Sequence, residues 1–465
     1  VYTMPEFLER RYNPQSRTIL SVISLVSYVL TKVAVTVYAG GLVFQQVFGI
    51  KELWGIDFFW IAAIGLVVLT ALYTIFGGMK SVLYTSVLQT PILLLGSLII
   101  LVLGFKELGG WDEMMRVCGA VTVNDYGDTM TNLIRSNDDA NFPWLGALIG
   151  SAIIGFWYWC TDQFIVQRVL SGKNEMEARR GTIFGAYLKL LPVFLFLIPG
   201  MIAFALHQKY IGAGGEGFLP MLANGTANAD AAFPTLVAKL LPAGVKGLVV
   251  CGILAALMSS LASLFNSSAM LFTIDFYKRF KPETPEKKLV GIGQIATIVI
   301  VVLGILWIPI MRSVGDVLYT YLQDVQSVLA PGIAAAFLLG ICWKRTSAQG
   351  GMWGLISGMV IGLTRLGAKV YYSNAGEVAD STFKYLFYDM NWLFFCGWMF
   401  LFCIIVVIVV SLATEAPTAE KIQGLVFGTA TKKQKAATRA SWNHWDIIHT
   451  VIILAITAAF YWYFW

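Results

Sequence analysis

The stretch that decides the fold class runs from residue 288 to residue 310 and reads KLVGIGQIATIVIVVLGILWIPI. After Lys288 it contains no charged residue, and its length matches the roughly 20 apolar residues that a helix needs to cross a bilayer. Similar runs recur along all 465 residues, of which 57% are hydrophobic and 13% charged. Soluble domains are less apolar and carry more charge. The sequence therefore predicts an all-α integral membrane protein.

The apolar runs predict eleven membrane helices in a single transmembrane domain that covers residues 1–465. The expected spans are 17–48, 55–77, 82–105, 143–167, 181–206, 247–275, 288–310, 315–342, 350–371, 388–413 and 445–465. Loops on the side of residue 1 carry twice as many lysines and arginines as the opposite loops and span ends. The positive-inside rule then places residue 1 in the cytoplasm and Trp465 outside. We expect a multi-pass protein of the plasma membrane, which in a bacterium is the inner membrane.

Composition and motifs provide no candidate residues for redox, phosphoryl-transfer or zinc chemistry. The chain has three histidines and six cysteines, without metal-ligand spacing and without a glycine-rich phosphate loop. The net charge of +6 follows from the basic loops, so it implies no nucleic-acid partner. The polar, basic stretch 414–444 is expected to tether a peripheral last helix, and it is a candidate contact for anionic lipid.

A lysine near the middle of an apolar span is the clearest polar signal. Lys189 lies in FGAYLKLLPVF, residues 184–194, and must find a carboxylate, a carbonyl, water or a ligand. One interpretation is a ligand-binding role, and Pro192 supports it because a proline leaves a carbonyl free and favours an irregular, hydrated site. The other interpretation is a structural ion pair with Asp162 or Asp324.

Hydroxyl groups form a stripe on the span 247–275. Their spacing of three and four residues places them on one face of a helix, together with one alanine. The stripe consists of Ala256, Ser259, Ser260, Ser263 and Ser267. Hydroxyl and carbonyl oxygens are hard ligands that suit an alkali cation. Serines that bond to their own helix and allow close packing are the alternative, and the spacing alone does not choose between the two.

Two stretches carry aromatic or polar residues that are suited to binding a sugar. In GFWYWCTDQFIVQR, residues 155–168, rings precede Asp162 and Gln163, so rings could cover the C–H face of a sugar while polar groups bind its hydroxyls. In YLQDVQSVLAPG, residues 321–332, Gln323 can donate and accept hydrogen bonds as a hydroxyl requires. An interfacial aromatic belt and helix–helix hydrogen bonding are the alternatives.

Several long motifs, in order, carry a family resemblance. FWYWCTDQFIVQRVLSGKN, GAYLKLLPVFLFLIPGM, LAALMSSLASLFNSSAMLFTIDFYKR, YLQDVQSVLAPGIAAAFLLGICWKR and ALYTIFGGMKSVLYTSVLQT resemble the sodium:solute symporter family, and within it the sodium/glucose cotransporter branch. The resemblance extends from residue 2 to about residue 425. It implies the leucine-transporter-like fold, an inverted repeat of five helices around a midplane site. It also implies three further helices, missing from this chain, that precede YTMPEF in the family.

The resemblance assigns roles to particular residues. The positions that match sugar-contacting residues of the family are Tyr158, which is implied as the inner gate, Trp159, Lys189 and Gln323. Those that match its main sodium site are the carbonyl of Ala256 and the hydroxyls of Ser259 and Ser260. One departure concerns Tyr84-Thr85-Ser86, where the branch commonly has Tyr-Thr-Asp. The acid associated with a second sodium site is therefore absent, which predicts one sodium ion per sugar.

We therefore predict a secondary active transporter that couples sodium influx to uptake of a sugar, glucose or galactose, by alternating access. Its partners are a small-molecule sugar, the sodium ion as its only cofactor, and the lipid bilayer. It is not an enzyme, because no bond is made or broken. Myo-inositol or another polyol is the alternative solute. A sodium channel and a transporter-like sensor are further alternatives, but the chain has no filter loop, and 414–444 is too short for a signalling domain.

Overall fold

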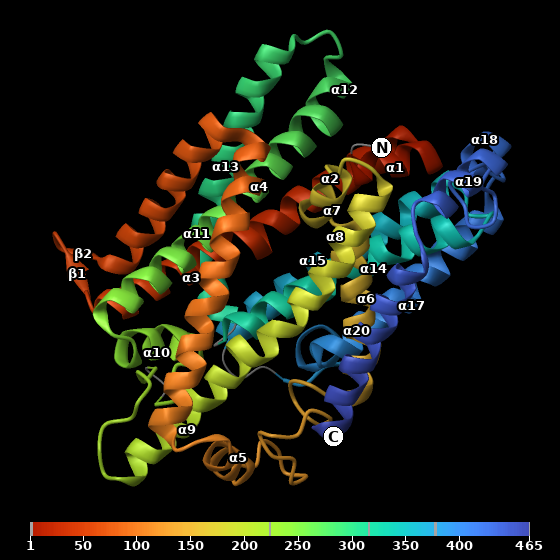
Figure 1. Cartoon of the computed structure of the whole chain (residues 1–465). Helices are drawn as coiled ribbons and strands as arrows, with labels where there is room; N and C mark the ends of the chain where they lie inside the picture. Colours follow the sequence, from red (N-terminus) through yellow and green to blue (C-terminus); the bar gives the residue numbers. More distant parts are fainter. Residues whose placement is uncertain (1–2, 223–224, 315–316, 376–378, 465) are drawn as a thin grey trace. The chain divides into compact units, whose positions relative to one another are not determined.

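The computed structural model describes residues 3–222, 225–314, 317–375 and 379–464, which are mostly helical (Figure 1). Among them, the side chains of residues 73, 75–83, 85, 88 and 312–314 lie outside the described set. One short hairpin of two antiparallel strands, β1 (Glu52–Leu53) and β2 (Ile56–Asp57), interrupts the helices. The all-α prediction holds for the rest of the described residues.

The chain divides into two compact units made of interleaved segments. Unit 1 consists of Val1–Ala34, Asn137–Ile183 and Ser267–Thr450, and unit 2 of Val35–Ser136, Phe184–Asn266 and Val451–Trp465. Each unit therefore gathers segments that are far apart in the sequence. The single transmembrane domain over residues 1–465 stays a prediction.

Unit 1 begins with two short capped helices, α1 (Met4–Arg11) and α2 (Pro14–Ser27). Asn13 Oδ1 accepts the backbone N–H of Ser16 at 2.8 Å and so satisfies one of the free donors at the start of α2. Pro14 follows at the first helical position, where its missing N–H is not needed. Asn13-Pro14 thus begins the helix that continues into the first membrane span.

The remaining helices of unit 1 include several π-helical segments, labelled η. In chain order, the remaining elements of unit 1 are η1 (Tyr28–Val33), α6 (Trp144–Phe156), η2 (Trp157–Thr161), α7 (Gln163–Leu170), η5 (Leu271–Tyr277), α12 (Lys278–Phe280), α13 (Glu286–Val314), α14 (Leu318–Cys342), α15 (Ala348–Asn374), α16 (Thr382–Lys384), η6 (Tyr385–Asp389), α17 (Trp392–Ala413), α18 (Ala419–Ile422) and α19 (Lys432–Ala440). The last helix, α20 (His444–Tyr463), starts in unit 1 and continues into unit 2.

The core of unit 1 is the close packing of α14, α15 and α17. A Cβ atom added to Gly358 on α15 would lie 2.6 Å from the Cα atom of Gly332 on α14, so the two backbones are in direct contact. Small residues at a helix interface allow this approach in membrane proteins, where van der Waals packing drives helix association. The helix that carries Gln323 and Asp324 is thereby packed directly against α15.

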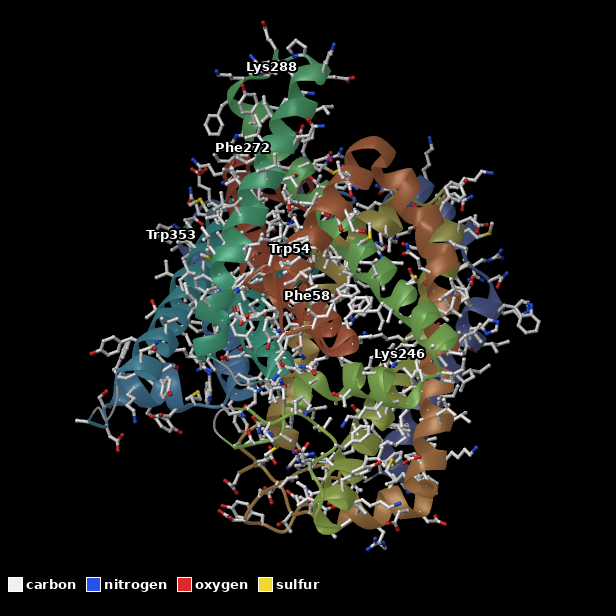
Figure 2. All side chains as sticks on the ribbon, turned by 90° about the vertical axis from the view of Figure 1, so that its left-hand side faces the viewer. Trp54, Phe58, Lys246, Phe272, Lys288 and Trp353 are labelled. Carbon is white, nitrogen blue, oxygen red and sulfur yellow. The ribbon has the colours of Figure 1, made fainter. Side chains whose placement is uncertain are left out.

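Unit 2 contains the long helices α4 and α11. Its elements are nearly all of α3 (Ala34–Phe48), α4 (Phe58–Leu108), α5 (Trp111–Gly119), the second half of α8 (Glu175–Pro192), η3 (Val193–Leu197), α9 (Ile198–Gly212), the 3₁₀ turn η4 (Ala229–Ala231), α10 (Ala232–Leu240) and most of α11 (Ala243–Met270). Helix α4 rises from the hairpin near Phe58, bends sharply and returns towards α5 (Figures 1 and 2). It therefore has two legs, which correspond to the expected spans 55–77 and 82–105.

Among the described residues, nine helices are long and apolar enough to cross a membrane. They are Pro14–Phe48, Gln89–Leu108, Trp144–Thr161, Glu175–Gly212, Ala243–Phe280, Glu286–Met311, Leu318–Cys342, Trp392–Ala413 and His444–Tyr463. Phe58–Leu72, in the first leg of α4, is a shorter apolar segment. The expected span 350–371 lies within α15, which is not one of the nine. The chain is a multi-pass membrane protein, and the exact number of eleven crossings stays a prediction.

Candidate functional site

The aromatic stretch of unit 1 is a break between two helices. Helix α6 continues into the π-helical turn η2. The helical backbone is interrupted at Asp162, and α7 starts at Gln163. Asp162 Oδ1 accepts the backbone N–H of Phe164 at 3.2 Å and so caps α7. The wider π turn presents Trp157, Tyr158 and Trp159 in sequence just before the break. Such π-helical turns are frequently found at functional sites.

A buried ion pair holds this break against the first span. Lys32, on η1, pairs with Asp162, and only 9% of the lysine side chain and 2% of the aspartate side chain are exposed. The hydroxyl of Tyr28 donates to Asp162 Oδ1 at 3.2 Å. Asp162 therefore binds a cation, a hydroxyl and a backbone N–H, which together satisfy a buried carboxylate.

Aromatic rings surround the lysine of this pair. The Nζ atom of Lys32 lies 4.2 Å from the ring centre of Phe164, 4.7 Å from that of Tyr28 and 5.6 Å from that of Tyr158. These distances are within the range of cation–π attraction. Tyr158, the implied inner gate, thus lies beside a fixed positive charge, and its ring packs edge-on against Trp159 at 5.2 Å between centres.

Gln323, the second polar candidate of unit 1, lies on α14, the helix that packs against η2. Its Nε2 donates to the hydroxyl of Tyr319 at 3.2 Å, one turn earlier on the same helix. The Tyr319 ring contacts Phe142, with 6.5 Å between ring centres. Gln323 is half-buried, so it combines a fixed orientation with access for a ligand.

The carboxylate next to Gln323 serves a different purpose. Asp324 pairs with Lys369 on α15, and the guanidinium of Arg365 lies 3.6 Å away. Arg365 is fully buried, donates to the carbonyl of Met390 at 2.7 Å and stacks on Phe395 at 4.1 Å. These contacts tie α14 and α15 to the start of α17.

Lys189, the sugar candidate of unit 2, is exposed near the end of α8. Helix α8 ends at Pro192, and the π-helical η3 follows, so the backbone here is irregular as expected from the proline. Asp162 and Asp324, the carboxylates considered as its structural partners, form ion pairs with Lys32 and Lys369. Its role in sugar binding stays a prediction.

The sodium candidates of unit 2 lie on α11, and one of them, Ser259, contacts the second leg of α4. The hydroxyl oxygens of Ser259 and Ser86 are 2.6 Å apart, which is a hydrogen bond in either direction. Ser259 is 7% exposed, whereas Ala256 and Ser260 are half-buried. Ser263 donates to the backbone carbonyl of Ser259 at 3.0 Å, which is the back-bonding considered as the alternative for the stripe.

Close packing of α4 and α11 makes the Ser86–Ser259 contact possible. A Cβ atom added to Gly96 would lie 2.5 Å from Val249 Cγ2, and one added to Gly252 would lie 3.1 Å from Ile92 Cγ2. A glycine of each helix therefore packs against a branched side chain of the other helix. The position that departs from the family, Ser86, is next to a predicted sodium ligand, and nothing in the linear spacing indicates this.

Lys32 and Tyr28 lie at this break, but they were not predicted as site residues from the sequence. The available signal was a lysine inside an apolar span, the same signal that identified Lys189. The sequence does not show that Lys32 and Asp162 are close in space, because 130 residues separate them along the chain.

Comparisons with known proteins agree with the resemblance. The family model described as "Sodium:solute symporter family" matches residues 1–358. The sodium/mannose cotransporter of Bos taurus is 35% identical, over 100% of this chain and 80% of that protein. Sodium/glucose cotransporter 1 of Ovis aries is 37% identical over 89% of this chain, and sodium/myo-inositol cotransporter 2 of Homo sapiens is 35% identical over 92%. The chain spans 64% of the length of each of the latter two.

A solved structure shows the fold. The substrate-bound outward-open state of a Na⁺-coupled sialic acid symporter superposes with a TM-score of 0.66, at 21% identity, over 90% of this chain and 78% of that one. This likeness confirms the predicted all-α, leucine-transporter-like fold.

Proposed function

Because the chain belongs to the sodium:solute symporter family, we propose that it couples the inward flow of sodium to the uptake of a hexose such as glucose or galactose. Sodium is the coupling ion that the family implies. The observation that carries the sugar assignment is the match, over at least 89% of this chain, to cotransporters named for glucose and mannose. A polyol is the second candidate, supported by the relative named for myo-inositol.

The sugar site that we propose uses rings and hydrogen-bonding groups together. Tyr158 and Trp159 cover the apolar face of the sugar, and the amide of Gln323 and the ammonium group of Lys189 bind its hydroxyls. In unit 1 the edge-on pair of rings lies on the turn η2, and α14, the helix that carries Gln323, packs against this turn.

The sodium site that we propose lies on α11. The carbonyl of Ala256 and the hydroxyls of Ser259 and Ser260 supply hard oxygen ligands. The hydroxyl of Ser259 can bond to Ser86 and still offer a lone pair to a cation, because a hydroxyl oxygen accepts twice.

Transport by this route makes and breaks no covalent bond, so the protein acts as a carrier and not as an enzyme. The binding of one ion and one sugar at the midplane is followed by alternating access. We place the protein in the plasma membrane, or the inner membrane of a bacterium, with residue 1 in the cytoplasm and Trp465 outside, from the distribution of basic residues.

Uptake into liposomes tests the proposal. The purified protein is reconstituted and given an inward sodium gradient, and labelled glucose is offered alone or with an excess of galactose, mannose, myo-inositol, sialic acid or an amino acid. We expect sodium-dependent glucose uptake that hexoses inhibit more strongly than the other solutes. Uptake that only myo-inositol inhibits would select the polyol, and uptake that is insensitive to all sugars and polyols would refute the proposal.

A further inference from the structure

The short helix α19 presents a positively charged face next to the last membrane span. Its residues Lys432–Ala440 are all exposed. A capping box makes the helix well defined, because Thr431 and Gln434 each bond to the other's backbone N–H, at 3.2 and 2.8 Å. At about 100° per residue, the side chains of Lys432, Lys435 and Arg439 lie within roughly 60° of one another on the helix.

No acidic side chain of its own segment balances this charge. Between Glu420 and Asp446 the sequence contains no aspartate or glutamate. Asp446 is buried, and its carboxylate accepts the backbone N–H of Asn443 at 2.8 Å. Directly after its first turn, the adjoining helix α8 adds Arg179, whose guanidinium donates to Ser441 at 3.2 Å. The acidic residues of that turn are Glu175 and Glu177, and both are exposed.

The position of α19 in the chain brings this charge to the membrane surface. Only three residues separate its end at Ala440 from the start of the apolar helix α20. None of the residues in the most apolar part of α20 is buried within the protein. Trp442 and Trp445 flank that start, and tryptophan is enriched at the membrane–water interface. Arg439 stacks on Trp442 at 4.2 Å, which links the basic face to an interfacial ring.

We propose that α19 is a binding surface for anionic phospholipid headgroups, formed by Lys432, Lys435 and Arg439 and anchored by Trp442. A basic cluster directly beside a membrane helix attracts anionic lipid, and each charge near the surface contributes about a fivefold preference. Three charges then favour an anionic lipid over a zwitterionic one by on the order of 100-fold at low salt. Screening removes this preference as the Debye length falls to about 3 Å in 1 M salt.

The test compares two variants that lose the same charge. In the first, Lys432, Lys435 and Arg439 are all replaced by glutamine. The matched control replaces Lys281, Lys287 and Lys288 by glutamine, three exposed cations around the start of α13, where Figure 2 places Lys288 at the tip of the hairpin with α12. Unlike the α19 cations, these three lie among the exposed carboxylates of Glu283 and Glu286, which offset part of their charge. Phosphatidylglycerol and phosphatidylcholine are titrated onto the whole protein in neutral detergent, and binding of the first lipid is measured by native mass spectrometry.

We expect the wild-type protein and the control to prefer phosphatidylglycerol by on the order of 100-fold, and the α19 variant to lose most of that preference. Equal losses in both variants would overturn the proposal, and so would a preference that is unchanged in the α19 variant or that persists in 1 M salt. Thermal unfolding of the three proteins in the same detergent confirms that each is folded, since all six substituted side chains are exposed.

Discussion

Lys32 and Asp162 form an ion pair inside unit 1, with at most 9% of either side chain exposed. The pair joins the π-helical part of the first span to the break that follows Tyr158 and Trp159. Removal of one member leaves the other as an uncompensated buried charge, whereas removal of both leaves none. This difference gives the pair a distinct mutational signature.

We expect Lys32→Met and Asp162→Asn each to lower the free energy of unfolding by about 3–5 kcal/mol, and the double variant to recover a large part of the loss. Thermal unfolding of the purified proteins in detergent measures this. The control is Lys384→Met, which breaks a pair with Asp380 whose carboxylate side chain is 96% exposed, and which should leave the midpoint of thermal unfolding nearly unchanged because an exposed pair contributes little. Strictly additive effects of the two single substitutions would contradict the pairing.

Gln323→Ala and Lys189→Ala should each abolish sugar uptake while the protein stays folded. The reason is that both side chains are proposed to bind hydroxyls and neither is fully buried, so little packing is lost. Gln349→Ala and Lys433→Ala remove the same side chains at exposed positions and should transport normally. Sugar binding within twofold of wild type in both site variants would mean that the two residues are structural.

Ser260→Ala should raise the sodium concentration for half-maximal uptake by about tenfold, equivalent to about 1.4 kcal/mol. A dehydrated cation loses a hard oxygen that alanine does not replace. Ser263→Ala is the matched control, because the hydroxyl of Ser263 bonds to the carbonyl of Ser259 in the same helix. Sodium dependence that is unchanged in Ser260→Ala would place the ion elsewhere.

We predict that one sodium ion accompanies each sugar. Ser86 places a neutral hydroxyl 2.6 Å from Ser259, and a second buried cation without a counter-charge is poorly stabilised. One charge that crosses about 100 mV releases roughly 2.3 kcal/mol. A tenfold sodium gradient adds about 1.4 kcal/mol. The sum of about 3.7 kcal/mol supports accumulation of the sugar by several hundred-fold.

Reversal potentials of the reconstituted protein measure this ratio. In Ser86→Asp the new carboxylate lies beside Ser259, so the ratio of sodium to sugar should rise towards two. The conservative variant Ser86→Thr keeps a hydroxyl and should keep a ratio of one. A ratio near two in the wild-type protein would disprove the prediction.

Gly96→Ala should lower the free energy of unfolding by about 1–3 kcal/mol, because the new methyl group would overpack the contact with Val249. The substitution should also weaken sodium binding, since it separates Ser86 from Ser259. Adding Val249→Ala should relieve the clash. The control is Gly65→Ala in the other leg of α4, where no atom lies within 4 Å of the added carbon and a helical alanine should stabilise by about 0.5–1 kcal/mol. Equal stability changes at both glycines would refute the close contact.

Local features of this protein are determined by its sequence alone. Apolar runs such as 288–310 require helices, because a backbone in hydrocarbon must satisfy its own hydrogen bonds. The cap at Asn13 and the irregular backbone after Pro192 also follow from neighbouring residues. The motifs on η2, α8, α11 and α14 are sufficient to recognise the family, since they are long and occur in order.

Contacts between distant segments were decided by the tertiary structure. Lys32 and Lys189 give the same signal in the sequence, a lysine in an apolar span, yet packing pairs Lys32 with Asp162 and leaves Lys189 exposed. Likewise, Ser86 approaches Ser259 only because Gly96 and Gly252 let α4 and α11 pack closely. Hydropathy and spacing depend on residues within a few turns of one another. A pair of partners separated by more than 100 residues depends instead on which helix faces meet, and that is settled by the packing of whole helices.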